Sequence, residues 1–155
     1  MSRSPDLFPS LSGLLRKAVG PALRADAGDF LDMCAEDIVF EFPFAPPAAV
    51  DRLDGKAALA AYLPKVAELL DIESMELVAS YRDADNDTFV IEFRCLGRSR
   101  VADARYDQDY ISVVTLRDGL IARYRDYWNP LIVLQAAGGD GALRALMAEG
   151  DGDAA

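Results

Sequence analysis

The stretch that decides the fold is Asp109–Pro130, which reads DYISVVTLRDGLIARYRDYWNP. At its centre lies Asp118-Gly119, a typical two-residue hairpin turn, because both central positions of a type I′ turn need a positive φ angle. The flanking segments are rich in β-branched and aromatic residues, as strands are. The stretch therefore predicts two antiparallel strands, 106–116 and 120–128, and a helix that Asn129-Pro130 begins.

The chain before this hairpin predicts helices first and strands afterwards. Apolar residues recur at helical spacing in three segments, 10–24, 27–35 and 55–70. One short strand, 38–42, lies among them, and alternating apolar residues predict further strands at 76–82 and 88–96. Such segregation of helices and strands is typical of the α+β class. We expect a cone-shaped, curved antiparallel sheet packed on three N-terminal helices, with a pocket between them.

Length and charge restrict the organisation and the partners. The chain has 155 residues and a net charge of −10, which fits one domain. We expect a flexible N-terminus over 1–9, the domain over 10–138, and a helical turn with a disordered tail over 139–155. An acidic surface repels phosphate groups, so we expect no nucleic acid and no membrane as partner. Without a signal peptide or an apolar run of about 20 residues, a cytoplasmic location is expected.

The absence of histidine limits the chemistry. It removes the most common metal ligand, the usual catalytic base and any Ser-His-Asp triad. The chain also has no P-loop, dinucleotide-binding or CxxC motif, so we expect neither a metal nor an organic cofactor. The two cysteines, Cys34 and Cys95, are expected to be small buried side chains. Any acid or base would be a carboxylate, tyrosine, lysine or arginine.

The hairpin register predicts which side chains share a face, because directly paired residues lie on the same side of a sheet. If Arg117 faces Leu120, Asp109 and Asp126 become diagonal neighbours on one face with Ile111, Val113, Tyr124 and Trp128. Two carboxylates in an apolar setting cannot both ionise easily, so one can act as general acid beside a general base. The other face, with Val114, Leu116, Ile121 and Tyr127, predicts a homodimer through the convex side of the sheet. A β-bulge would change part of this assignment.

Two segments of the chain resemble a known family. The run 123–130, RYRDYWNP, and the turn Arg117-Asp118-Gly119 resemble the closing hairpin of SnoaL-like proteins, in the nuclear-transport-factor-two-like superfamily. The run 34–41 resembles the second helix and first strand of that family. The resemblance covers most of residues 10–138 and implies the cone fold. The superfamily holds cyclases, isomerases, dehydratases, epoxide hydrolases and proteins without catalysis, so the fold alone does not give the function.

Three relatives in this superfamily suggest roles for single residues. In phenazine-biosynthesis A/B proteins and in limonene epoxide hydrolase, the acidic residue that corresponds to Asp126 takes part in proton transfer or water activation. The phenazine proteins have a histidine where this chain has Asp109. The epoxide hydrolase pair corresponds to Glu92 and Arg94, with the charges in reversed order. Ketosteroid isomerase has its aspartate base where this chain has Phe42, which argues against the usual mechanism of that enzyme.

These observations predict a small-molecule enzyme, an isomerase, cyclase or dehydratase, for an apolar substrate that can be cyclic. Asp126 and Asp109 would be catalytic, and the predicted substrate-binding residues are Tyr124, Trp128, Ile111, Val113, Phe42, Tyr62, Glu92 and Arg94. Glu92 and Arg94 could instead form an exposed ladder on the convex face. A salt bridge from Asp126 to Arg94 or Arg123 would indicate a non-catalytic binding or dimerisation module. Convergence of Glu92, Arg94 and Asp126 on one water would indicate an epoxide hydrolase.

Overall fold

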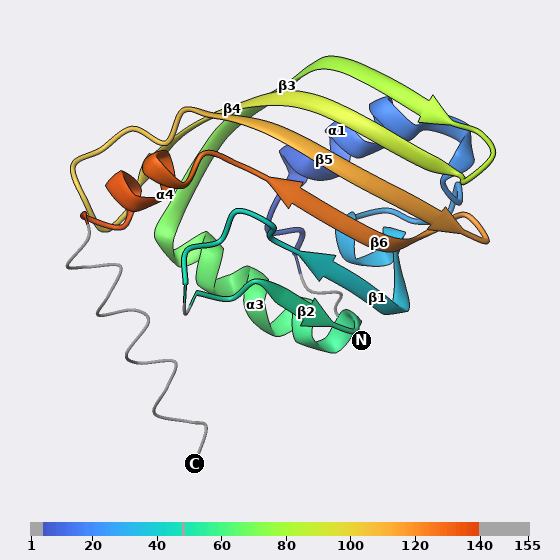
Figure 1. Ribbon diagram of the computed structural model, residues 1–155, viewed down its shortest axis with the longest axis horizontal. Coiled ribbons are helices and arrows are strands. Elements are labelled where there is room, and N and C mark those ends of the chain that lie inside the picture. The colour runs from blue at the N-terminus through green and yellow to red at the C-terminus, as the bar shows by residue number, and fades with distance from the viewer. Residues whose placement is uncertain (1–4, 48, 140–155) are drawn as a thin grey trace.

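The computed structural model describes residues 5–47 and 49–139. The elements follow in the order α1 (Pro9–Val19), a 3-10 turn (Gly20–Ala22), α2 (Phe30–Met33), β1 (Cys34–Glu41), β2 (Arg52–Asp54), α3 (Lys56–Leu69), β3 (Leu70–Asp83), β4 (Thr88–Ser99), β5 (Gln108–Arg117), β6 (Leu120–Tyr127) and α4 (Pro130–Ala136). The strands form one curved sheet in the order β2-β1-β6-β5-β4-β3 (Figure 1). All neighbouring strands are antiparallel except β1 and β6, which are parallel.

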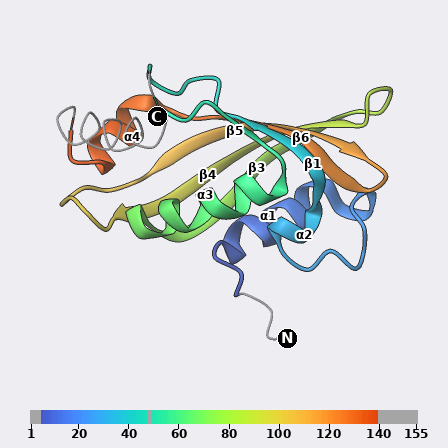
Figure 2. The same cartoon turned by 90° about the horizontal axis from the view of Figure 1, so that it is seen from below.

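The three N-terminal helices lie on one side of the curved sheet (Figure 2). The core between the two layers contains fully buried side chains from both, among them Leu15 of α1, Leu59 of α3 and Phe93 of β4. Helix α4 follows the last strand, where Asn129 caps it through a bond from the Leu131 N–H. The architecture confirms the predicted α+β cone.

Several element boundaries differ from the sequence prediction. The second helix is a single turn, because Cys34 already pairs with Ile121 of β6. Likewise β3 begins at Leu70 instead of residue 76, and the short strand β2 was not predicted. In each case pairing with a neighbouring strand extends the sheet beyond what local propensity indicates. The helical turn and tail predicted over 139–155 lie outside the described residues from residue 140 onward.

The closing hairpin has the predicted turn, with φ angles of 54° at Asp118 and 76° at Gly119. The register begins as predicted, with Arg117 opposite Leu120, and then shifts at a β-bulge around Ala122. As a result Asp126 lies opposite Ser112, whereas the sequence predicted Ile111. Beyond the bulge, the side chains of β6 face the sides of the sheet that were predicted. The side chains of β5 face the sides opposite to those predicted.

This exchange also corrects the predicted dimer surface. Val114, Leu116 and Ile121 belong to the core instead of the convex face.

Both cysteines are buried and free as expected, and burial raises the pKa of Cys34 and of Cys95 to about 12. No helix in the described part of the chain is both long and apolar enough to span a bilayer.

Candidate functional site

A cavity of about 150 Å³ lies between the concave face of the sheet and the helices α1, α3 and α4. That is about the volume of an engineered protein cavity that binds benzene. Its wall is mostly aromatic and aliphatic, and its polar side-chain groups are one carboxylate, four tyrosine hydroxyls and the indole N–H of Trp128. The aromatic and acidic lining residues are Phe8, Phe30, Phe40, Phe42, Tyr62, Phe93, Tyr106, Tyr110, Tyr124, Asp126 and Trp128.

Asp126 on β6 supplies the carboxyl group that lines this cavity. Its side chain is half-buried, and burial among apolar groups raises its pKa from 3.8 to about 7. No ion pair of Asp126 occurs within residues 5–47 and 49–139, since Arg94 pairs with Asp109 and Arg123 with Glu41. The salt bridge that would have indicated a structural role is therefore not formed, and the carboxyl titrates near neutral pH.

A short hydrogen-bonded chain holds this carboxyl. The Tyr124 hydroxyl donates to Ser112 Oγ over 2.8 Å, and Ser112 Oγ in turn donates to Asp126 Oδ1 over 3.1 Å. Ser112 and Tyr124 are buried, and both face inward because of the bulge. The Ser112 hydroxyl stabilises the ionised carboxylate and so opposes the effect of burial on its pKa. Fixed partners of this kind keep an acid or base in one orientation.

Replacing Ser112 by alanine should raise the pKa of Asp126 above its value of about 7, because the carboxylate loses its donor. The variant should also lose about 1–3 kcal/mol of stability, because the Tyr124 hydroxyl is left without its acceptor in a buried place. Carboxyl NMR titration measures the first effect and urea unfolding the second. Ser80→Ala is the control, since the Ser80 hydroxyl donates to the Ala18 carbonyl and lies away from the cavity. An unchanged or lower Asp126 pKa in Ser112→Ala would contradict the assignment.

Four of the predicted substrate-binding residues line the cavity with Asp126. They are Phe42, Tyr62, Tyr124 and Trp128. The Phe42 ring packs against Tyr62 and Trp128, with centroids 5.5 and 6.2 Å away. Burial and the nearby Asp126 carboxylate together raise the pKa of Tyr62, which stays protonated. Their part in binding a substrate remains a prediction.

The other predicted site residues lie on the outer face of the sheet. Asp109 is exposed and accepts a hydrogen bond of 2.9 Å from Arg94 Nε, and Glu92 is exposed beside them. Ile111 is 46% exposed, and Val113 also points outward. The predicted carboxylate pair of Asp109 and Asp126 is therefore wrong. Glu92, Arg94 and Asp126 do not converge, so the arrangement required for epoxide hydrolysis is absent from this sheet.

Sequence reasoning missed three inward-facing residues, Tyr106, Tyr110 and Ser112. The hydroxyl oxygens of Tyr106 and Tyr110 are 2.5 Å apart, and both rings line the cavity. Tyr110 also stacks on Phe93, with ring centroids 4.9 Å apart. The signal available was the spacing of Ile121 and Tyr124, two large apolar side chains that can both face inward only if a bulge separates them.

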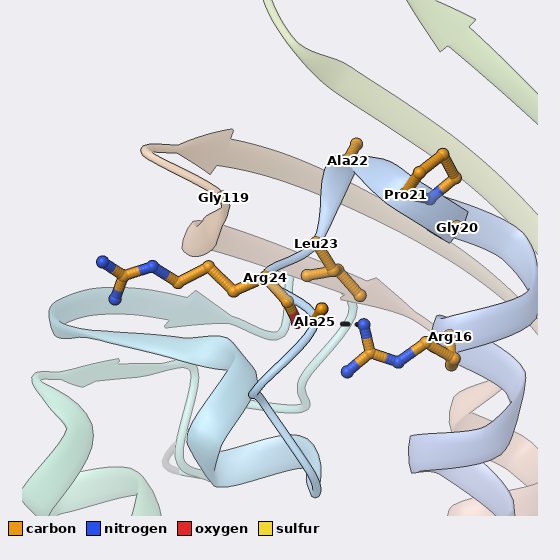
Figure 3. A pocket seen from close by; sticks show the side chains of 8 residues that line it. All are labelled: Arg16, Gly20, Pro21, Ala22, Leu23, Arg24, Ala25 and Gly119. Carbon is orange, nitrogen blue, oxygen red and sulfur yellow. Dashed lines mark hydrogen bonds between the residues drawn. The ribbon is translucent and has the colours of Figure 1, made fainter.

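A wider surface hollow of about 660 Å³ lies where the loop after α1 meets the tip of the closing hairpin (Figure 3). Arg16 donates to the carbonyls of Arg24 and Ala27, and the Arg24 N–H donates to the Gly119 carbonyl over 3.0 Å. These bonds hold the loop on the hairpin. Since Arg16 is committed to backbone carbonyls, we place the functional site in the cavity of Asp126 instead.

The fold and this cavity define a class of small cone-shaped proteins, and comparison with known proteins identifies the family. The family model described as a SnoaL-like domain matches residues 21–124. The chain therefore belongs to the SnoaL-like family. Structural neighbours include proteins of the nuclear-transport-factor-two-like fold, such as one from Burkholderia xenovorans, with a TM-score of 0.57 and 26% identity over 87% of this chain and 98% of that chain.

Similar sequences come from two bacteria. YesE of Bacillus subtilis is 42% identical over 85% of this chain and 90% of its own length. PA3332 of Pseudomonas aeruginosa, which is named PhzA/B-like, is 40% identical over 75% of this chain and 82% of its own. A Bacillus subtilis crystal structure described as a candidate isomerase has a TM-score of 0.71 and 39% identity, covering 88% of this chain and 98% of that one.

Proposed function

We propose that this protein is a small-molecule enzyme that moves protons with Asp126 as its general acid and base, in a reaction of the isomerase or cyclase type. The observation that carries the proposal is the carboxyl of Asp126, which faces an apolar cavity with a pKa of about 7. A general acid or base works best when its pKa lies near the working pH. Ionisable groups with strongly shifted pKa values in cavities are typical of active sites.

The cavity restricts the substrate to a small apolar molecule. Its volume of about 150 Å³ suits one six-membered ring. The aromatic wall favours a flat ring, because stacked and edge-on contacts with Phe42, Tyr62 and Trp128 are then available. In such a site the Asp126 carboxylate would remove a proton from a carbon next to a carbonyl, and the resulting acid would return it to another carbon. Atoms and charge balance without any other reactant.

The test is the conversion of 3-cyclohexenone to 2-cyclohexenone, followed by the ultraviolet absorption of the conjugated product. The carboxylate takes a proton from the carbon between the carbonyl and the double bond, and the proton returns at the far end of the double bond. We expect catalysis above the buffer rate. Binding of the ketone without turnover at any pH would instead indicate a non-catalytic small-ligand-binding module.

We also propose a homodimer through the outer face of the sheet, which keeps Tyr127 from the sequence prediction and has Ile111 and Val113 in place of the other residues. Ile111, Val113 and Tyr127 lie there together. The Nε atom of Arg125 among them is buried and has no hydrogen-bond partner in the described part of the chain. A second copy would cover the apolar side chains of this face.

Ile111→Asp should shift the protein from dimer to monomer in sedimentation equilibrium, because a charge is costly in a covered apolar interface. Val101→Asp is the matched control, since Val101 is also β-branched, apolar and exposed but lies in the loop between β4 and β5. A mass that does not change with Ile111→Asp, or a monomeric wild-type protein, would contradict the dimer.

A further inference from the structure

The hydroxyl pair of Tyr106 and Tyr110 is a second polar place in the cavity that the proton-transfer proposal does not use. Both residues are held firmly. Tyr106 is buried against Leu70, Cys95 and Ala136, and its N–H donates to the Gly97 carbonyl over 2.9 Å. Tyr110 stacks on Phe93. Fixed hydroxyls on an apolar wall are suited to orient a ligand, because little order has to be created when it binds.

The pair has one proton more than its internal bond uses. Two hydroxyls carry two protons, and one of these lies between the oxygens, 2.5 Å apart. Gln108 interacts with Tyr106 in the direction that lowers the pKa of the tyrosine, as a hydrogen-bond donor does, and its amide oxygen accepts from the Asn129 N–H. Within residues 5–47 and 49–139 the second proton has no hydrogen-bond acceptor. A buried donor without a partner favours a ligand that carries an acceptor.

The pair also lines the same cavity as the proton-transfer group. Tyr110 and Ser112 are two residues apart on the inner face of β5, about 7 Å along the strand, and Ser112 bonds Asp126. The Coulomb effect of the Asp126 carboxylate also reaches both tyrosines and contributes to raising their pKa values, after burial. Both hydroxyls therefore stay protonated at neutral pH and remain donors. The hydroxyl pair and the carboxyl therefore act on one and the same cavity.

We propose that the Tyr106–Tyr110 pair binds the carbonyl oxygen of a monocyclic ketone while the ring lies against the aromatic wall toward Asp126. This inference rests on the proposed function for the choice of substrate class, and it names the group that the cavity recognises. The pair would also stabilise the negative oxygen that forms when a neighbouring carbon loses its proton. Ketone binding needs only the hydroxyls, whereas turnover needs Asp126 as well.

The experiment uses 2-cyclohexenone as probe and cyclohexene as a probe of similar shape without oxygen. A donated hydrogen bond weakens the carbonyl bond, so the infrared C=O stretch of bound cyclohexenone should fall below its value in an apolar solvent. Tyr106→Phe and Tyr110→Phe should weaken cyclohexenone binding about tenfold and move the stretch back. Cyclohexene binding should not change. Tyr81→Phe is the control, since Tyr81 is exposed on β3.

The outcomes separate this inference from the proposed function. An unshifted stretch in the wild-type protein, no binding of cyclohexenone, or a shift that survives the double phenylalanine variant would overturn it. Loss of the shift in Tyr62→Phe instead would overturn it as well, because Tyr62 is another hydroxyl of the cavity. The C=O stretch measured in the wild-type protein tests the inference even if a variant fails to fold. Should 3-cyclohexenone not be isomerised while the stretch is still shifted, the proton-transfer proposal fails and the carbonyl site stands.

Discussion

Asp126→Asn should make the protein more stable at pH 8, by as much as about 4 kcal/mol, and leave its stability near pH 4 almost unchanged. The carboxyl has a pKa of about 7 in the folded chain and about 3.8 when unfolded. The folded state therefore binds more protons than the unfolded state between these values, so stability falls as the pH rises from about 4 to 7. Each pKa unit corresponds to about 1.4 kcal/mol. The neutral asparagine has no such cost.

The test is the free energy of unfolding of the wild-type and Asp126→Asn proteins, measured by urea unfolding at a series of pH values from about 4.5 to about 8.5. The stability difference should grow up to about pH 7 and then level off, because the wild-type carboxyl is fully ionised beyond that point. Asp109→Asn is the control, since that carboxyl lies on the outer face; its difference from wild type should not follow this curve. A difference between Asp126→Asn and wild type that does not vary with pH would show that the carboxyl is not desolvated.

The sequence was sufficient for the class of fold because its strongest signals are local. The Asp118-Gly119 turn, the capping Asn129 and the apolar spacing of α3 each depend on neighbours within a few residues, and the structure has all three. The start of β1 at Cys34 depends on a partner almost ninety residues later, Ile121, so no local pattern could place it. Tertiary pairing overrides local propensity at such positions.

Whether a site residue could be predicted from the sequence depends in the same way on a tertiary feature, the β-bulge beside Ala122. Strict alternation would place Ile121 on the same face as Arg123, among charged groups. The extra residue of the bulge buries Ile121 and Tyr124 together, and it costs one step of register. Beyond it, Tyr124 and Asp126 face the cavity as predicted, but Asp126 lies opposite Ser112 and not Ile111. The bulge is favoured because it buries additional apolar side chains, and the alternation of residues along a single strand does not reveal that gain.

The same Asp126→Asn change should lower the rate of 3-cyclohexenone isomerisation by about 10²- to 10⁴-fold at pH 8, the range usual for loss of a general acid or base. Asparagine keeps the shape and can still accept from Ser112, but it cannot take a proton. The wild-type rate should rise with pH and level off above about 7, because removal of the carbon proton needs the ionised carboxylate. Initial rates across this pH range measure both effects.

Stability and activity should therefore move in opposite directions in one variant, which separates lost chemistry from lost folding. The carboxyl that Asp126 places in an apolar wall destabilises the ionised protein, and the same burial holds its pKa where a base can work. Asp109→Asn should keep the wild-type rate, since that residue faces away from the cavity. An Asp126→Asn protein that is folded, more stable and still as active as wild type would remove Asp126 from the mechanism, while leaving the cavity as a binding site.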